Sequence, residues 1–212
     1  MKVDTKKLRD VQRKIAKEIR TSDEYKKEEI KRIGGFETAF FDDKIVCAAV
    51  VLDAKTFEIL EKKHTVSKVP MPYIPGFLAF REGPAIMQTY YSLELEPEVL
   101  FISGHGVAHP LKCGLASYVG VELEKATIGI AKKILVGEIK KEKIVILNET
   151  RGEEIKTREH AKPLYVSAGH LISLKMACDL VRKSIIPPHK MPEPLHEARK
   201  HVKKIVSEIQ SS

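Results

Sequence analysis

The chain has 212 residues, of which 43% are hydrophobic and 31% charged, so it can fold around a core and is not a disordered chain. Lys and Arg number 37 against 29 Asp and Glu, which gives a net charge of +8. This surplus favours a polyanionic partner, with nucleic acid ahead of an anionic membrane surface, although a solvated basic surface would give the same total. No apolar run could span a membrane and no signal peptide is visible, so we expect a cytoplasmic protein without a membrane partner, and we assume a monomer.

The cysteines give no sign of covalent or metal cross-links. Their number is odd, their spacing is wide, and no CxxC pair occurs among Cys47, Cys113 and Cys178. This pattern indicates neither a disulfide framework nor a Cys-based zinc site. Each cysteine lies among apolar residues, so we expect three small core side chains and a reducing compartment.

The first part of the chain predicts a basic helix followed by a β-meander. Apolar residues recur there at helical spacing: Leu8, Val11, Ile15 and Ile19. This pattern predicts an amphipathic helix over 5–20, within a basic segment, 1–30, that we assign to an N-terminal helix. Extended runs joined by short turns follow at 31–41, 44–52 and 56–61. Loops this short predict antiparallel neighbours.

The rest of the chain alternates between helix and strand patterns. Strands are predicted at 98–102, 126–130, 143–147 and 164–167, with a charged hairpin around 148–159. Helices are predicted at 77–93, 114–124, 173–184 and 194–209, the last within a basic C-terminal helix, 193–212. We therefore predict one α/β domain over 1–212. It is a ribonuclease H-like mixed sheet, an antiparallel β-meander plus a parallel βαβ continuation, with helices on both faces.

A proline-rich loop is the first candidate for chemistry. Pro72 and Pro75 flank Tyr73 and Ile74 and stiffen the loop. The tip is suited to wedging between stacked bases, or it is a structural proline turn. Glu82 lies in the helix that follows. It could serve as a general base or hold a metal ligand in place, or it could simply pair with a neighbouring cation.

A glycine-rich segment, SGHGVAHP at 103–110, directly follows a predicted strand. Glycine lets a ligand approach the backbone closely, and His105 and His109 could bind a phosphate or a metal. We reject zinc, because an HxxxH pair needs a helix and the glycines and Pro110 oppose one. Lys132 follows another strand and is either a phosphate ligand or a surface lysine.

Charged residues on other elements complete the candidate set. Catalytic groups in such a sheet lie at the ends of adjacent strands, which places Glu37 and Ser103 side by side. The last helix carries a basic stripe, Arg199, Lys200, Lys203 and Lys204. That stripe contacts a DNA backbone or is a solvated face. We interpret 166–170 as a strand-to-helix connection and His170 as structural.

Several motifs together resemble the endonuclease V family of repair nucleases. They are PYIPGFLAFREGP at 72–84, GHGVAHP at 104–110, GLAS at 114–117, TIGIAK at 127–132, VSAGH at 166–170 and PEP at 192–194. The resemblance covers most of the chain, from about Arg32 to Ala198. It implies a ribonuclease H-like fold, a wedge, a pocket for a flipped hypoxanthine and Mg²⁺-assisted hydrolysis near deoxyinosine.

Position by position, the resemblance assigns roles to these motifs. Tyr73 is the wedge, with Pro72, Ile74 and Pro75 around it. The residues that line the base pocket are Gly76, Leu78, Gly104 and Gly114. Glu82 matches the catalytic Glu of the family, and His109 and Lys132 match its phosphate-site residues.

The metal position is where this sequence departs from the family. The first strand of the family reads like Gly-Val-Asp, and this one reads Gly-Phe-Glu, ending at Glu37. Three further positions differ. Ser103 stands where the family has its second metal Asp, Leu111 stands where it has an Arg after His-Pro, and Arg199 stands where it has a His after PEP. His196 and His201 lie within a turn of Arg199.

These changes weaken the expected metal site. We assign Glu37 and Ser103 to the metal position and add Glu82 and Arg199 to the catalytic set. Mg²⁺ is a hard ion that proteins usually hold through carboxylates. A carboxylate ~4 Å from a unit charge contributes roughly 4 kcal/mol at an effective dielectric near 20, or about three decades in affinity. Mg²⁺ or Mn²⁺ is therefore expected to bind weakly or not at all.

Besides a generic basic scaffold with no nucleic-acid role, two functions remain open from the sequence. In the first, the chain is an endonuclease V-like nucleic-acid-binding protein that recognises hypoxanthine, on DNA rather than RNA, with weak or lost cleavage. In the second, it is an active Mg²⁺-dependent endonuclease that hydrolyses a phosphodiester 3′ to deoxyinosine in DNA repair. Glu37 and Glu82 would then hold the ion, and Ser103 would act through water.

Overall fold

The computed structural model describes residues 3–211. Its elements are, in chain order, α1 Thr5–Glu18, β1 Arg32–Phe41, β2 Lys44–Asp53, β3 Ile59–Lys68, α2 Leu78–Tyr90, β4 Val99–Ser103, α3 Leu115–Leu123, β5 Ala126–Ala131, β6 Glu138–Lys140, β7 Lys143–Ile146, β8 Glu149–Ile155, β9 Leu164–His170, α4 Leu174–Lys183 and α5 Glu193–Ser211.

The strands form one sheet of nine, in the order β3-β2-β1-β4-β5-β9-β8-β7-β6. β1, β2 and β3 pair antiparallel as a meander. β4 lies between β1 and β5 and is parallel to both. The remaining pairs, from β5 outward to β6, are antiparallel. This arrangement confirms the predicted mixed sheet of a meander plus a parallel βαβ unit.

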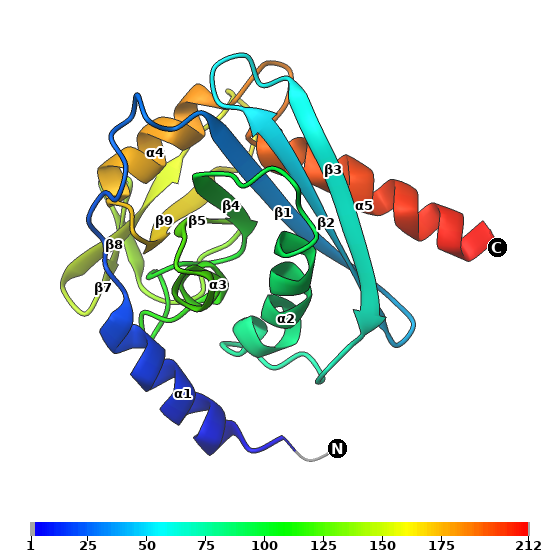
Figure 1. Cartoon of the computed structure of the whole chain (residues 1–212). Coiled ribbons are helices and arrows are strands. Elements are labelled where there is room, and N and C mark those ends of the chain that lie inside the picture. The colour runs from blue at the N-terminus through cyan, green and yellow to red at the C-terminus, as the bar shows by residue number, and fades with distance from the viewer. Residues whose placement is uncertain (1–2, 212) are drawn as a thin grey trace.

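Helices cover both faces of the sheet, as predicted. Figure 1 shows α2 and α3 on one side of β1–β4 and α5 on the other. The side chains from Ile45 to Leu52 in β2 are fully buried, because α2 packs on one face of this strand and α5 on the other. A strand covered on both faces needs a continuous apolar run, which is what the sequence of β2 provides.

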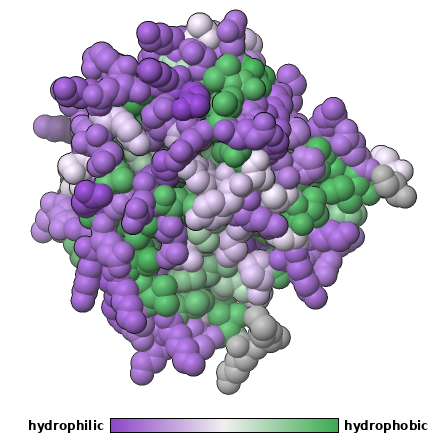
Figure 2. All heavy atoms as spheres, viewed as in Figure 1, coloured by the Kyte–Doolittle hydropathy of each residue, from purple (hydrophilic) through white to green (hydrophobic). Residues whose placement is uncertain are grey.

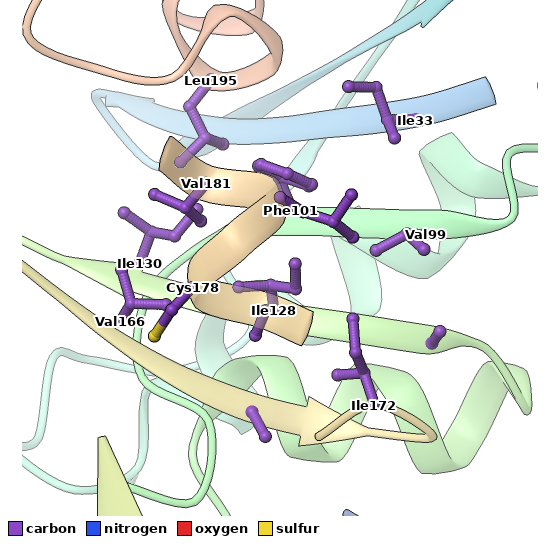
Figure 3. Close-up of a cluster of buried hydrophobic side chains, with 14 of the residues drawn as sticks. Ile33, Val99, Phe101, Ile128, Ile130, Val166, Ile172, Cys178, Val181 and Leu195 are labelled. Atoms are coloured by element: carbon purple, nitrogen blue, oxygen red, sulfur yellow. The ribbon is translucent and has the colours of Figure 1, made fainter. Parts of the chain in front are cut away.

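The largest buried cluster lies between the central strands and α4. Figure 3 shows side chains of β1, β4, β5 and β9 packed against Val181 and Cys178 of α4, with Leu195 of α5 above them. Phe101 at its centre has no exposed surface. Burial of one such side chain contributes about 1.5–3 kcal/mol, so this cluster fixes the strands whose ends carry the candidate site.

The start of α5 is held against β1 by a glycine. A Cβ atom at Gly35 would overlap the backbone carbonyl of Pro194, so only glycine allows this approach. The contact places the first turn of α5 two residues before Glu37 on β1. The basic stripe of α5 therefore begins beside the predicted metal position.

The prediction for the third strand was wrong in its position. β3 begins at Ile59 rather than Thr56, because Asp53 accepts hydrogen bonds from the backbone N–H groups of Lys55 and Thr56 and closes a turn there. Phe57 in this turn has a positive φ of 60°. The strand then continues to Lys68 as an edge strand of half-buried and exposed residues, which hides its pattern in the sequence.

Three further boundaries differ from the predictions. The basic N-terminal helix ends at Glu18 rather than 30, because the chain leaves it to bond the end of β9: Arg20 N–H donates to His170 Nδ1, and Leu171 N–H donates to the Arg20 carbonyl. Segment 166–170 belongs to β9 and is not a connection. The charged segment 148–159 holds β8, and β6 was missed because its side chains are exposed. Residues 1, 2 and 212 of the predicted terminal helices lie outside the described residues.

The remaining expectations concern cysteines and the surface. Cys47, Cys113 and Cys178 are free and buried, as predicted for core side chains. No helix between residues 3 and 211 is long and apolar enough to cross a membrane. On the face seen in Figure 2, hydrophilic side chains cover most of the surface, with smaller hydrophobic areas between them.

Candidate nucleic-acid interface

The proline loop between β3 and α2 is fixed at its start and presents an aromatic tip. The side chain of Tyr73 is 65% exposed. Arg81 of α2 donates a hydrogen bond from Nη1 to the Met71 carbonyl, and its guanidinium lies 4.2 Å from the centroid of the Phe40 ring. Because Arg81 is held by both contacts, it ties the start of the loop to the sheet. The tip therefore projects without being free to fold back.

The end of the loop is held through one carbonyl oxygen. The Gly76 carbonyl accepts from Gln12 Nε2 at 2.8 Å and contacts His109 Nε2 at 3.0 Å. Gln12 also donates to the Cys113 carbonyl at 3.3 Å and is 1% exposed. Gly76 itself has a φ of 82°, a conformation that favours glycine. Sequence reasoning missed Gln12, although a glutamine among the apolar positions of the first helix was a usable signal.

His109 bonds within the protein through both ring nitrogens. Leu111 N–H donates to its Nδ1 at 3.2 Å, so Nδ1 carries no proton and Nε2–H donates to the Gly76 carbonyl. Burial lowers the pKa of His109, and the charge of Arg151 lowers it further, while the bond to Gly76 opposes them. We therefore interpret His109 as a neutral residue that holds the loop. The resemblance had placed it at a phosphate.

A pocket of about 400 Å³ opens beside the loop. Seven of the residues assigned to the nucleic acid line it: Tyr73, Gly76, Leu78, Gly104, His109, Gly114 and Lys132. Pro72, Ile74 and Pro75 do not line it and flank the exposed tip instead. The size and the mostly apolar lining suit one small flat group such as a nucleobase.

Backbone forms part of the wall of this pocket. A Cβ at Gly114 would overlap the carbonyl of His105, so the 103–110 segment packs directly against the start of α3. His105 also lines the pocket, and burial lowers its pKa to about 4, so its ring is neutral. The close approach of these backbone segments leaves a narrow wall on this side of the pocket, suited to a flat group.

Glu37 and Ser103 lie side by side, as predicted. The parallel pairing of β1 with β4 reaches Phe36 and Ile102, so the next residues on these strands are Glu37 and Ser103. Glu82 approaches from α2 and accepts a hydrogen bond from Thr38 Oγ1 at 2.6 Å. Burial raises the pKa of Glu82 to about 7, and the charge of Glu37 raises it too, against the opposing effects of Thr38 and Arg81.

One lysine approaches the Glu37 carboxylate, and further cations lie near that lysine. Lys132 Nζ lies 4.0 Å from Glu37 Oε1, and Glu37 Oε2 is buried without a hydrogen-bond partner in the described part of the chain. Burial lowers the pKa of Lys132; Glu37 opposes this, and the charges of Arg199, Lys190 and Lys203 lower it further. Arg199 thus brings a positive charge close to Lys132.

The nearby histidines of α5 do not replace the family histidine at whose position Arg199 stands. His196 stacks on His189 with ring centroids 3.6 Å apart, and His189 Nδ1 lies 2.6 Å from Glu193 Oε1. His201 meets the ring of His64 on β3 at 5.5 Å. His196 is therefore engaged with His189, and His201 lies against β3 with its Nε2 buried and without a hydrogen-bond partner among the described residues.

The residues at this position do not fit a divalent cation. Mg²⁺ needs several oxygen ligands and usually one or two ionised carboxylates. Here Glu37 is joined by a hydroxyl, by Glu82, whose pKa is raised to about 7, and by the Lys132 ammonium. Within residues 3–211, no group of three or more His, Cys, Asp or Glu side chains is arranged to hold a metal.

Comparison with known proteins gives one family. The family model described as Endonuclease V matches residues 13–200. The Endonuclease V of Dictyoglomus thermophilum is 39% identical over 205 residues, covering 93% of this chain and 89% of that protein. The Endonuclease V of Archaeoglobus fulgidus is 34% identical, covering 99% of this chain and 96% of its own length.

Solved structures of endonuclease V proteins have the same fold as this chain. Endonuclease V from Streptomyces avermitilis superposes with a TM-score of 0.91 at 29% identity, covering 99% of this chain and 96% of that one. Endonuclease V from Ciona intestinalis, in complex with a 24mer DNA containing an inosine followed by a ribo-adenosine, superposes with a TM-score of 0.88 at 27% identity, covering 97% and 98%. The chain therefore belongs to the endonuclease V family and has its ribonuclease H-like fold.

Proposed function

We propose that this protein binds nucleic acid at a deaminated base, hypoxanthine, and has weak or lost endonuclease activity. The observation that carries the proposal is a contrast between two neighbouring places. The pocket and the loop carry the residues that the resemblance assigns to recognition, whereas Ser103 stands in place of one metal carboxylate and Lys132 approaches the other, Glu37.

Recognition is supported by the geometry of the loop and pocket. An exposed tyrosine on a loop held at both ends can enter a base stack at little cost in conformational entropy. The pocket begins beside Tyr73 and is large enough for the displaced base. The Ciona relative binds a DNA that contains inosine, and we extend that preference to this chain, on DNA in preference to RNA.

Weak cleavage is supported by the side chains that are available to bind a metal ion. Metal-assisted phosphodiester hydrolysis needs an ion that activates water and neutralises the developing charge. Ser103 brings no charge, and the Lys132 ammonium, 4.0 Å from Glu37, competes with an ion for that carboxylate. Glu82 can still exchange a proton near neutrality, since its pKa is raised to about 7. The second function, an Mg²⁺- or Mn²⁺-dependent endonuclease, rests on Glu37 and Glu82 alone and is the alternative outcome of the tests.

The proposal is tested by binding to matched strands. Fluorescence anisotropy with labelled oligonucleotides that carry inosine or adenine at one position should show tighter binding to inosine, with an affinity that falls steeply with salt. Tyr73→Ala should weaken binding to the inosine strand by about tenfold or more, because base stacking contributes about 1–3 kcal/mol. Tyr91, 73% exposed and away from the pocket, gives the control Tyr91→Ala. Equal losses on both strands would reject the wedge.

A further inference from the structure

Lys132 approaches Glu37, and three further cations from two other segments lie near enough to Lys132 to lower its pKa. Lys132 follows β5, Lys190 lies in the connection between α4 and α5, and Arg199 and Lys203 lie on α5. Arg199 and Lys203 are four residues apart, so they lie on one face of the helix. The packing of Pro194 on Gly35 keeps that helix alongside β1.

These cations are largely without counter-charges. In the described range, Lys132 makes one ion pair, with Glu37 at 4.0 Å, at the limit of such contacts. Within the same residues, no salt bridge or side-chain hydrogen bond involves Lys190, Arg199 or Lys203. By contrast, Lys200 on the same helix lies 3.6 Å from Glu197. A group of like charges held together without partners destabilises the free protein, so it indicates a place for an anion.

The group continues directly into the base pocket. Lys132 lines the pocket and also approaches Glu37, so the two places share a wall. In a nucleotide chain the phosphate is attached next to the base through the sugar. A base in the pocket would therefore bring a backbone phosphate to Lys132 and the side chains around it.

We propose that Lys132, Lys190, Arg199 and Lys203 bind the phosphodiester next to the flipped base, in the place of a divalent ion. This inference rests on the proposed function and adds that binding needs no metal. Arginine is suited to this role because its planar guanidinium donates two hydrogen bonds to one phosphate, and lysine adds a point charge. Nucleic-acid binding should then be driven by counterion release at this site.

The first test compares metal conditions. Anisotropy titrations of single-stranded DNA with inosine or adenine at one position, in EDTA and in Mg²⁺, should give the same preference for inosine, with Mg²⁺ weakening binding to both strands only as a competing counterion. Inosine-selective binding that appears only with Mg²⁺ would overturn the inference and leave the proposed function standing. A different result would reject the proposed function instead. In that case binding would be independent of Mg²⁺ and would need these cations, but it would show no preference for inosine.

The second test assigns the contact to one phosphate. Arg199→Gln should weaken binding about tenfold and lower the slope of log affinity against log salt by about one. The matched control is Lys200→Gln, the next residue on the helix, which should leave the slope nearly unchanged. Replacing the phosphodiesters on either side of the inosine, one at a time, with a neutral methylphosphonate should remove the effect of Arg199→Gln at one of them. Equal effects of Arg199→Gln and Lys200→Gln, or an Arg199→Gln effect that survives both replacements, would overturn the inference.

Discussion

Replacing Ser103 with Asp, together with Glu37→Asp and Arg199→His, should create a divalent-cation site at the position where we propose that this protein has lost one. The parallel register places residue 103 beside residue 37, on strands that lie about 4.8 Å apart. Two carboxylates at that separation can share one ion. Each one ~4 Å from the ion contributes roughly 4 kcal/mol per unit charge at an effective dielectric near 20, or about three decades in affinity.

The same arithmetic explains why Ser103→Asp alone should give only a small gain. Lys132 lies 4.0 Å from Glu37 and competes with the ion for that carboxylate, and Arg199 repels the ion. Glu37→Asp withdraws the carboxylate by about a bond length, and a misplacement of ~1 Å can cost ~10²-fold in rate. Arg199→His removes the competing charge and provides an imidazole able to transfer a proton.

Calorimetry with Mg²⁺ and Mn²⁺ measures the effect, followed by a nicking assay on inosine-containing strands. We expect no stoichiometric Mg²⁺ binding by the natural sequence and clear binding and nicking by the triple variant. A triple variant that folds, binds inosine strands and still binds no Mg²⁺ would refute the reasoning, since side-chain identity would then not be the cause. A tight Mg²⁺ site in the natural protein that disappears in Glu37→Ala would refute it as well.

Three further changes test the supports of the site. Gln12→Leu removes the hydrogen bonds to the Gly76 and Cys113 carbonyls, so denaturant unfolding should show a loss of about 2 kcal/mol and anisotropy a smaller preference for inosine. The raised pKa of Glu82, about 7 against an ordinary 4.5, makes its contribution to stability complete below pH 4.5 and lost as the pH rises through 7, a change of about 3 kcal/mol. Glu82→Gln should remove that slope from unfolding curves measured across this range. Gly35→Ala should displace α5 and lower the unfolding temperature, with a destabilisation of about 1–3 kcal/mol.

The interior of the fold could be predicted from the sequence because burial leaves a pattern. The apolar run of β2 and the short strand at β4 were visible, and the order of elements then placed Glu37 beside Ser103. The outer strands could not be placed in the same way. β3 and β6 are the two edge strands and are rich in Lys and Glu, because an edge strand exposes its side chains to water and is protected from pairing by charge. β8 lies inside the sheet, but its Glu and Arg residues gave its segment the appearance of a charged hairpin.

The site was predicted as far as its motifs reach. The resemblance grouped residues from separate motifs, and seven of those assigned to the nucleic acid line one cavity. The contacts that support them join segments far apart in sequence: Gln12 bonds Gly76 and Lys132 approaches Glu37. No spacing within a segment encodes such a contact, so the role of Gln12 and the gathering of cations around Lys132 needed the structure.

The central claim is that recognition persists where the metal site has been replaced. It is tested most directly by measuring binding and nicking on the same inosine-containing strands, single- and double-stranded, in DNA and RNA, with EDTA, Mg²⁺ or Mn²⁺. We predict selective binding to inosine under all three conditions and little or no nicking under any of them. Nicking by the natural protein with Mg²⁺ at the rate of the triple variant would contradict the claim, and it would show that another group supplies the ligand that Ser103 does not.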